Sequence, residues 1–157
     1  SGNANIATAV VPAPSATPLP KTERPKSGTV LNLGSKRGGY GQLLISNGTP
    51  NDALVRLIDV SIDKTYREIY VRANSAASIT GIAAGNYDLL FTTGQDYAPS
   101  IKKFLRDSDY SKFGSQLNFV ETWSDGGVGF KKFEVTLNPV AHGNTSITKI
   151  DESAFDR

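Results

Sequence analysis

The stretch Gly85-Asn-Tyr-Asp-Leu-Leu-Phe-Thr92 decides the fold class. Three of its bulky side chains, Tyr87, Leu89 and Phe91, occupy alternate positions. Such alternation is typical of a strand that has one face against a core, because successive side chains of a strand point to opposite faces. We therefore predict a β-strand over residues 86–92 that packs on the interior of a sheet protein.

Similar runs of β-branched and aromatic residues lie between turn signals on both sides of this stretch. At residues 101–106, the spacing of the apolar residues fits a helical turn as well as a strand, so both alternatives stay open. Strands are predicted at 42–46, 54–60, 64–72, 78–80, 117–122 and 130–137. About eight strands without a sustained helical pattern predict an all-β fold, an antiparallel β-sandwich or a partly open barrel. The predicted core residues are Leu43, Ile45, Val55, Leu57, Ile69, Val71, Ile79, Tyr87, Leu89, Phe91, Phe119, Phe133, Val135 and Leu137.

The first 27 residues differ in composition from the rest of the chain. They are rich in proline, alanine and threonine and include Val11-Pro-Ala-Pro-Ser-Ala-Thr-Pro-Leu-Pro20. Proline fixes φ and donates no backbone hydrogen bond, so this composition disfavours helix and sheet. We predict a flexible, disordered linker over residues 1–27 and a β-sandwich domain over residues 28–157. A spacer is favoured over a ligand for an SH3-like groove, because no flanking arginine or aromatic pattern supports the ligand.

No signal peptide is visible at the N-terminus, and the chain resembles a fragment of a longer protein. The compartment cannot be assigned from these residues. The expectation leans towards an extracytoplasmic or membrane-tethered location, through a region that precedes Ser1.

The composition of the chain argues against several classes of function. The chain has no cysteine, which excludes thiol chemistry. Its single histidine, His142, lies in a turn-like Pro139–Asn144 segment, and one histidine argues against His-rich metal sites and a His-centred triad. Residues 28–157 contain 14 basic and 14 acidic side chains, so no field that gathers nucleic acid or anionic lipid is expected. The segment Asp107–Ser111 has calcium-loop spacing, but Lys112 and Asn118 stand at the glycine and glutamate positions. We expect a non-enzymatic module without metal or cofactor.

Several segments together resemble a known domain type. They are Gly41–Thr49, Asp52–Leu57, Tyr70–Asn74, Ile82–Tyr87, Phe91–Tyr97 and Val135–Val140 with Gly143-Asn144. This pattern resembles an uncharacterised bacterial domain found at the C-terminus of longer proteins, behind linkers or membrane segments. The Ile79-to-Phe91 unit is more distantly similar to PEGA and carboxypeptidase-regulatory-like sandwiches. The resemblance implies a sandwich fold and a modular habit, and it implies no activity.

The candidate binding residues are the aromatics predicted in loops, Trp123, Tyr97 and Tyr110, together with Asp96 and Arg72. Loop aromatics stack on sugar rings or anchor protein interfaces. For Trp123, plugging one end of the sandwich is an equal alternative. For Arg72, a structural bidentate bond to Asp59 or Asp96 is favoured over ligand binding.

These residues predict a tethered module that binds a partner, in first place a protein. The alternative is a carbohydrate- or cell-wall-binding module, and an enzyme that uses unpaired acids is the third hypothesis. Neither nucleic acid nor membrane insertion by this segment is expected. Exposure of the Trp123 indole separates the first two hypotheses, because a buried indole would remove the main sugar platform.

Overall fold

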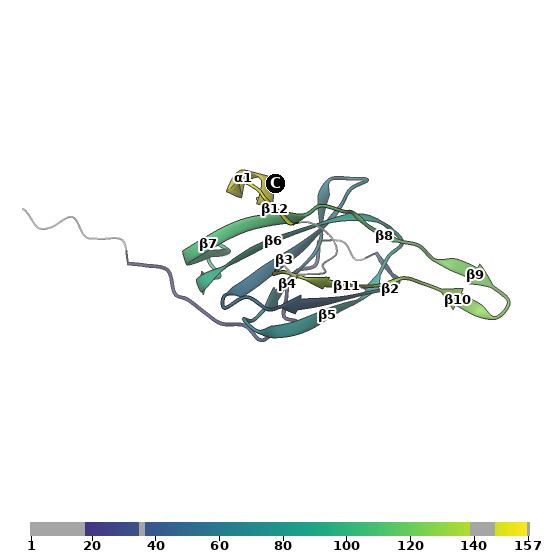
Figure 1. Cartoon of the computed structure of the whole chain (residues 1–157), viewed down its shortest axis with the longest axis horizontal. Helices are drawn as coiled ribbons and strands as arrows, with labels where there is room; N and C mark the ends of the chain where they lie inside the picture. The colour runs from purple at the N-terminus through teal and green to yellow at the C-terminus, as the bar shows by residue number, and fades with distance from the viewer. Residues whose placement is uncertain (1–17, 35–36, 139–146, 157) are drawn as a thin grey trace, which may run out of the picture.

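The computed structural model describes residues 18–34, 37–138 and 147–156, which form a β-sandwich with a protruding hairpin (Figure 1). The larger sheet has the order β1-β4-β3-β6-β7-β12, with β8 paired to β6. The smaller sheet has the order β11-β2-β5, and β9 pairs with β10 in the hairpin. The bounds are β1 Val30–Asn32, β2 Gly38–Asn47, β3 Asp52–Asp59, β4 Lys64–Val71, β5 Ser75–Ile82, β6 Gly85–Ala98, β7 Lys103–Phe113, β8 Leu117–Phe119, β9 Thr122–Ser124, β10 Gly127–Gly129, β11 Lys132–Thr136, β12 Ile147–Lys149 and α1 Glu152–Phe155. The predicted all-β sandwich is confirmed.

The inner core lies between the two sheets. All the predicted core residues except Phe133 are buried there. Phe133 is only partly buried and packs against this core, with its ring centroid 4.9 Å from that of Phe119. Alternation within each strand therefore identified the inner face of both sheets correctly.

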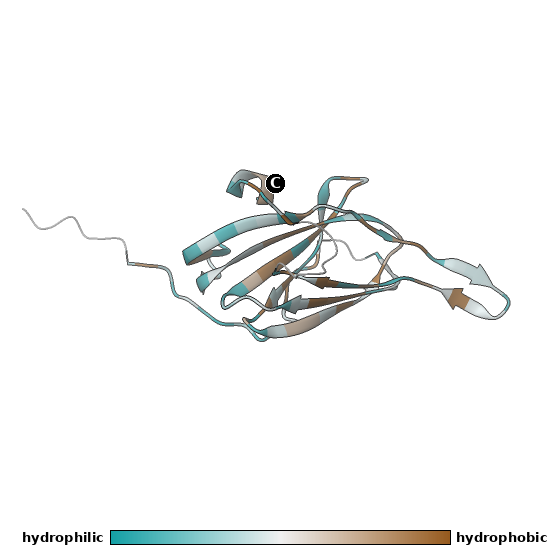
Figure 2. Ribbon diagram, in the orientation of Figure 1, coloured by the Kyte–Doolittle hydropathy of each residue, from teal (hydrophilic) through white to brown (hydrophobic). Residues whose placement is uncertain are grey.

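The larger sheet is also buried on its outer face. In β3 every residue from Ala53 to Asp59 is buried, so its two faces are both covered. The outer face carries a second apolar cluster, which the chain termini help to cover. Its buried members are Leu54, Ile58, Tyr70, Leu90, Tyr97, Phe104 and Phe155. The alternation of hydrophobic and hydrophilic segments along the strands can be followed in Figure 2.

A bulge in β4 changes which way Tyr66 points. Leu57 pairs with Arg67 and Ile58 with Thr65, which leaves Tyr66 as the extra residue. Tyr66 therefore joins the inner core beside Ile69, although simple alternation placed it on the face of Tyr70. Its hydroxyl accepts a hydrogen bond from the Ala83 amide at 3.0 Å and donates to the Arg37 carbonyl.

One open alternative is resolved, and two strand assignments differ from the sequence prediction. The ambiguous segment at 101–106 belongs largely to a strand, β7. The predicted strand over 117–122 is divided between β8, which pairs with β6, and β9, which begins the hairpin. The last predicted strand, β11, pairs with β2 in parallel, whereas the prediction was antiparallel throughout. β2 and β11 are separated along the chain by all the strands from β3 to β10, and so long a connection permits this parallel pairing.

The N-terminal strap, residues 22–29, is packed on the domain. The Glu23 amide donates to the Tyr97 carbonyl at 2.8 Å, and the Gly28 amide donates to the Tyr70 carbonyl at 2.7 Å. Ser27 Oγ accepts from the Arg72 amide at 2.8 Å. The predicted linker is therefore wrong over residues 23–27, which belong to the folded domain. Residues 1–17 of that prediction lie outside the described residues.

A buried ion pair connects the outer face of the larger sheet to the C-terminal helix. Arg56 Nη2 lies 2.6 Å from Glu68 Oε2, and both side chains are almost wholly buried. Arg56 also donates to the Phe155 carbonyl, and its Cζ lies 4.2 Å from the centroid of the Phe155 ring. Removing one partner of such a pair leaves a buried charge uncompensated.

We therefore expect Glu68→Ala to lower the free energy of unfolding by about 3–5 kcal/mol, because Arg56 would stay buried without its carboxylate. The measurement is urea denaturation followed by far-ultraviolet circular dichroism. The matched control is Asp109→Ala, which removes an exposed ion pair with Lys149 and should cost at most about 1 kcal/mol. Equal costs for the two variants would contradict this account of the outer face.

Candidate aromatic binding site

Three aromatic side chains meet at the base of the protruding hairpin, and we call them the aromatic patch: Tyr40 of β2, Trp123 of β9 and Phe130 after β10. The Trp123 side chain is 67% exposed, with Tyr40 at 46% and Phe130 at 38%. The ring centroids of Tyr40 and Trp123 lie 5.6 Å apart with an interplanar angle of 75°. Those of Tyr40 and Phe130 lie 6.3 Å apart at 28°. The patch is thus one continuous, solvent-exposed aromatic surface.

A glycine-rich segment of β2 packs closely against the base of the hairpin. The Tyr40 amide donates to Glu121 Oε2 at 3.0 Å. A Cβ on Gly39 would lie 2.5 Å from that same oxygen and 2.6 Å from the Ile82 carbonyl oxygen, so a side chain there would force the chains apart. All the residues from Gly38 to Gly41 are part of β2. Close approach of the backbones explains the glycine.

Hydrophobic surface extends from the patch along the hairpin. Val128 lies opposite Trp123 in the two-stranded ladder, and Figure 2 shows a hydrophobic segment on β10. Lys132 places its Nζ 5.9 Å from the centroid of the Phe130 ring. Aromatic faces with a cationic rim suit recognition of apolar or ring-shaped groups, since they combine large contact area with few side-chain torsions.

The other predicted aromatic residues are not part of this surface. Tyr97 is buried in the outer cluster under the strap, with its ring centroid 5.5 Å from that of Tyr70. Tyr110 is half-buried against Phe155 of α1. Burial raises the pKa of both hydroxyls. Trp123 is the exposed member of the predicted trio, and the alternative in which it plugs the sandwich is wrong.

Asp96 and Arg72 serve structural contacts. Asp96 pairs with Arg106 across the β6–β7 ladder. Arg72 donates from Nε to the Pro25 carbonyl at 2.8 Å and from Nη2 to the Arg24 carbonyl at 2.6 Å. The expected bond from Arg72 to Asp59 or Asp96 is therefore wrong, and the guanidinium fixes the strap instead.

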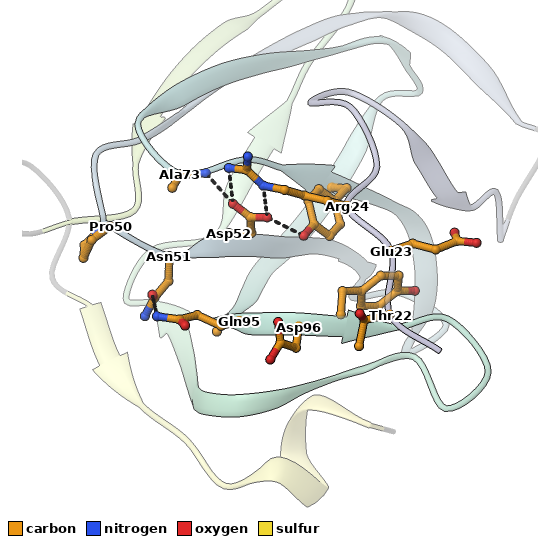
Figure 3. Close-up of a pocket in the computed structure, with 12 residues that line it drawn as sticks. Thr22, Glu23, Arg24, Pro50, Asn51, Asp52, Ala73, Gln95 and Asp96 are labelled. Atoms are coloured by element: carbon orange, nitrogen blue, oxygen red, sulfur yellow. Dashed lines mark hydrogen bonds and ion pairs between the residues drawn. The ribbon is translucent and has the colours of Figure 1, made fainter. Parts of the chain in front are cut away.

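A pocket of about 390 Å³ lies where the strap crosses the end of β6 (Figure 3). On its wall, Asn51 Oδ1 accepts from Gln95 Nε2 at 3.1 Å. Arg24 donates two hydrogen bonds to the Asp52 carboxylate, from Nε to Oδ2 at 2.9 Å and from Nη2 to Oδ1 at 3.0 Å. The carboxylate also accepts from the Tyr70 hydroxyl at 2.6 Å and from the Ala73 amide at 2.8 Å.

The electrostatics of this pocket are set by Asp52. Burial alone would raise the pKa of its carboxyl, but the hydrogen bonds from Arg24, Tyr70 and Ala73 outweigh burial and hold that pKa below its usual value. Burial and the bond to Asp52 raise the pKa of the Tyr70 hydroxyl. Asp52 is therefore a paired, ionised anchor for the strap at neutral pH.

The acidic segment once compared with a calcium loop lies within strand β7. Asp109 pairs there with Lys149. Among the residues that the structure describes, no group of three or more His, Cys, Asp or Glu side chains is placed to hold a metal ion. His142, the single histidine, lies outside the described residues.

Comparison with known proteins adds no further constraint on the site. Neither a protein family, nor a curated protein, nor a solved structure matches this chain.

The geometry of Asp52 predicts a pH dependence. A carboxyl whose pKa is lower in the folded state stabilises the fold above its unfolded pKa of about 4, and this contribution is lost as the pH falls through the folded value. The free energy of unfolding of wild type should therefore exceed that of Asp52→Asn most at neutral pH. The difference should shrink below pH of about 4. Urea denaturation between neutral pH and about pH 2.5 measures it.

Asp125→Asn is the matched control, because Asp125 is exposed in the hairpin turn and should behave as wild type throughout. A difference between wild type and Asp52→Asn that does not change with pH would show that the ion pair with Arg24 does not account for the stabilisation.

Proposed function

We propose that the chain is a non-enzymatic recognition module that binds its partner through the aromatic patch. The single observation that carries this proposal is the exposure of Tyr40, Trp123 and Phe130 as one surface. Large aromatic side chains are costly to leave in water, and contiguous exposed aromatics are typical of interaction sites.

The scaffold supports such a role. The patch is held on one side by β2, a central strand of the smaller sheet, and on the other by a hairpin fixed through Glu121. Recognition residues on a rigid scaffold lose little conformational freedom on binding. The patch lies at one end of the molecule, whereas the strap enters at the other end (Figure 1), so a tethered module would present its binding surface away from the tether.

A protein is the favoured partner class. The balanced charge of residues 28–157 gives no support to nucleic-acid binding. The helix that the structure describes, α1, has four residues, so none of the described helices reaches the length of a membrane span. We also propose that the module has an accessory role in a larger bacterial protein, as PEGA-like domains do.

Exposure of Trp123 favours one alternative, a carbohydrate- or cell-wall-binding module. A sugar ring stacks on a flat aromatic face. The 75° angle between Tyr40 and Trp123 prevents the two rings from forming one flat platform for neighbouring sugars. A glycan would therefore bind through Trp123 alone or through the parallel Tyr40–Phe130 pair.

The test selects ligands without assuming their class. Wild-type protein is used to recover binders from a random peptide library and from a glycan array. We expect Trp123→Ala and Tyr40→Ala each to lower the affinity for the recovered ligands about tenfold or more, as truncation of an aromatic anchor does at other interfaces. Ile62→Ala, which removes an exposed apolar side chain in the β3–β4 turn, should leave binding unchanged. Ligands that bind Trp123→Ala as well as wild type would place the binding surface elsewhere.

A further inference from the structure

We propose, on the basis of the function above, that the aromatic patch binds the segment Pro18-Leu19-Pro20 of a second copy of this chain. Molecules would then join head to tail, with the strap end of one copy on the hairpin of the next. The proposal names the chemistry of the ligand, a proline-flanked apolar segment in extended polyproline II conformation.

The segment itself is presented for binding. Leu19 is 82% exposed, the most exposed large hydrophobic side chain in the described part of the chain. Prolines on both sides restrict its backbone to extended conformations, so little entropy is lost when it docks. A polyproline II segment has no internal hydrogen bonds, and its carbonyl oxygens face outwards as acceptors.

The patch offers what such a segment needs. Proline-rich segments dock on surfaces lined with aromatic rings. Tyr40 and Phe130 are close to parallel and Trp123 stands edge-on, which gives angled ring faces on either side of Tyr40. The Tyr40 hydroxyl and the Trp123 indole N–H have no hydrogen-bond partner among the described residues, and both can donate to a carbonyl oxygen.

The segment cannot reach the patch of its own molecule. Glu23 is fixed to Tyr97, and Leu19 lies four residues before it, so Leu19 stays within about 14 Å of that anchor. Tyr97 is near one end of β6, and Gly85 at the other end is roughly 40 Å away along an extended strand.

The hairpin lies beyond that far end of β6. Gly85 pairs with Phe119 of β8, and the chain continues from there into β9 and β10. Figure 1 shows the strap and the hairpin at opposite ends of the molecule. A second copy is therefore needed to bring the two surfaces together. Because the two surfaces differ, the contact is heterologous, and it produces open chains or closed rings of molecules.

Two complementary full-length variants test this arrangement by sedimentation velocity. Trp123→Ala keeps the segment and loses the patch, whereas the triple change Pro18→Ser, Leu19→Ser, Pro20→Ser keeps the patch and loses the segment. Wild type is expected to self-associate with rising concentration. Each variant alone should self-associate about tenfold or more weakly, and their mixture should form a one-to-one dimer that grows no further. Trp123, Pro18 and Leu19 are exposed and Pro20 is half-buried, so melting curves equal to that of wild type are required to show that both variants fold.

Several outcomes would overturn the proposal. One is wild type that stays monomeric up to about 1 mM, the range of a weak specific contact. Another is variants that associate as wild type does, and a third is a mixture without heterodimers. Ile62→Ala is the matched control and should associate as wild type does. An equal loss in that variant would show general apolar association and would also overturn it.

A peptide titration separates this proposal from the proposed function. A synthetic peptide of residues 11–20 should shift the emission of Trp123, the single tryptophan of the chain. If that peptide gives no shift while a library peptide or a chitohexaose probe does, the segment is not the ligand, yet the aromatic patch remains a recognition site. If those probes bind wild type and Trp123→Ala equally, both proposals fall.

Discussion

The burial of both faces of the central strands in the larger sheet constrains the rest of the molecule. β3 and β6 place apolar side chains on the inner face, against the smaller sheet, and also on the outer face. An apolar sheet face exposed to water is costly, at about 25 cal/mol for each Å². The chain covers this face with its two ends, α1 from one side and the strap from the other, and the Arg56–Glu68 pair links α1 to the sheet.

Much of the inner core could be predicted because each strand there has a more polar opposite face, as Leu43 and Ile45 do in β2. The outer cluster could not, because alternation assigns one face to the core and leaves the other to solvent. Leu54 and Ile58 therefore had no assigned neighbours. The strap was missed for a related reason. The prolines of residues 1–27 disfavour sheet, but the Pro25 carbonyl accepts a hydrogen bond from Arg72, and a carbonyl can accept without a backbone N–H.

The candidate site was predicted only at Trp123. Tyr40 precedes Trp123 by more than eighty residues, and no local pattern connects the two positions. The glycines around Tyr40 allow the backbone to approach Glu121 closely, but nothing in their local sequence indicates that distant partner. Tyr97 and Tyr110 were assigned to loops, but both lie in strands, beneath the strap and beside α1. A tyrosine in a sequence gives no sign that a distant segment covers it.

The parallel pairing of β11 with β2 has a consequence for how the chain acquires its structure. The Gly48 amide donates to Asn138 Oδ1 across a separation of 90 residues, and the whole β2–β11 ladder has a similar span. During synthesis, β2 can pair with β5 early, but its other edge stays open until the hairpin and β11 have left the ribosome. A topology dominated by such distant contacts folds on the order of milliseconds to seconds. Completion of the smaller sheet thus waits until most of the chain has been made, and until then the open β2 edge is exposed to wrong pairing with other strands.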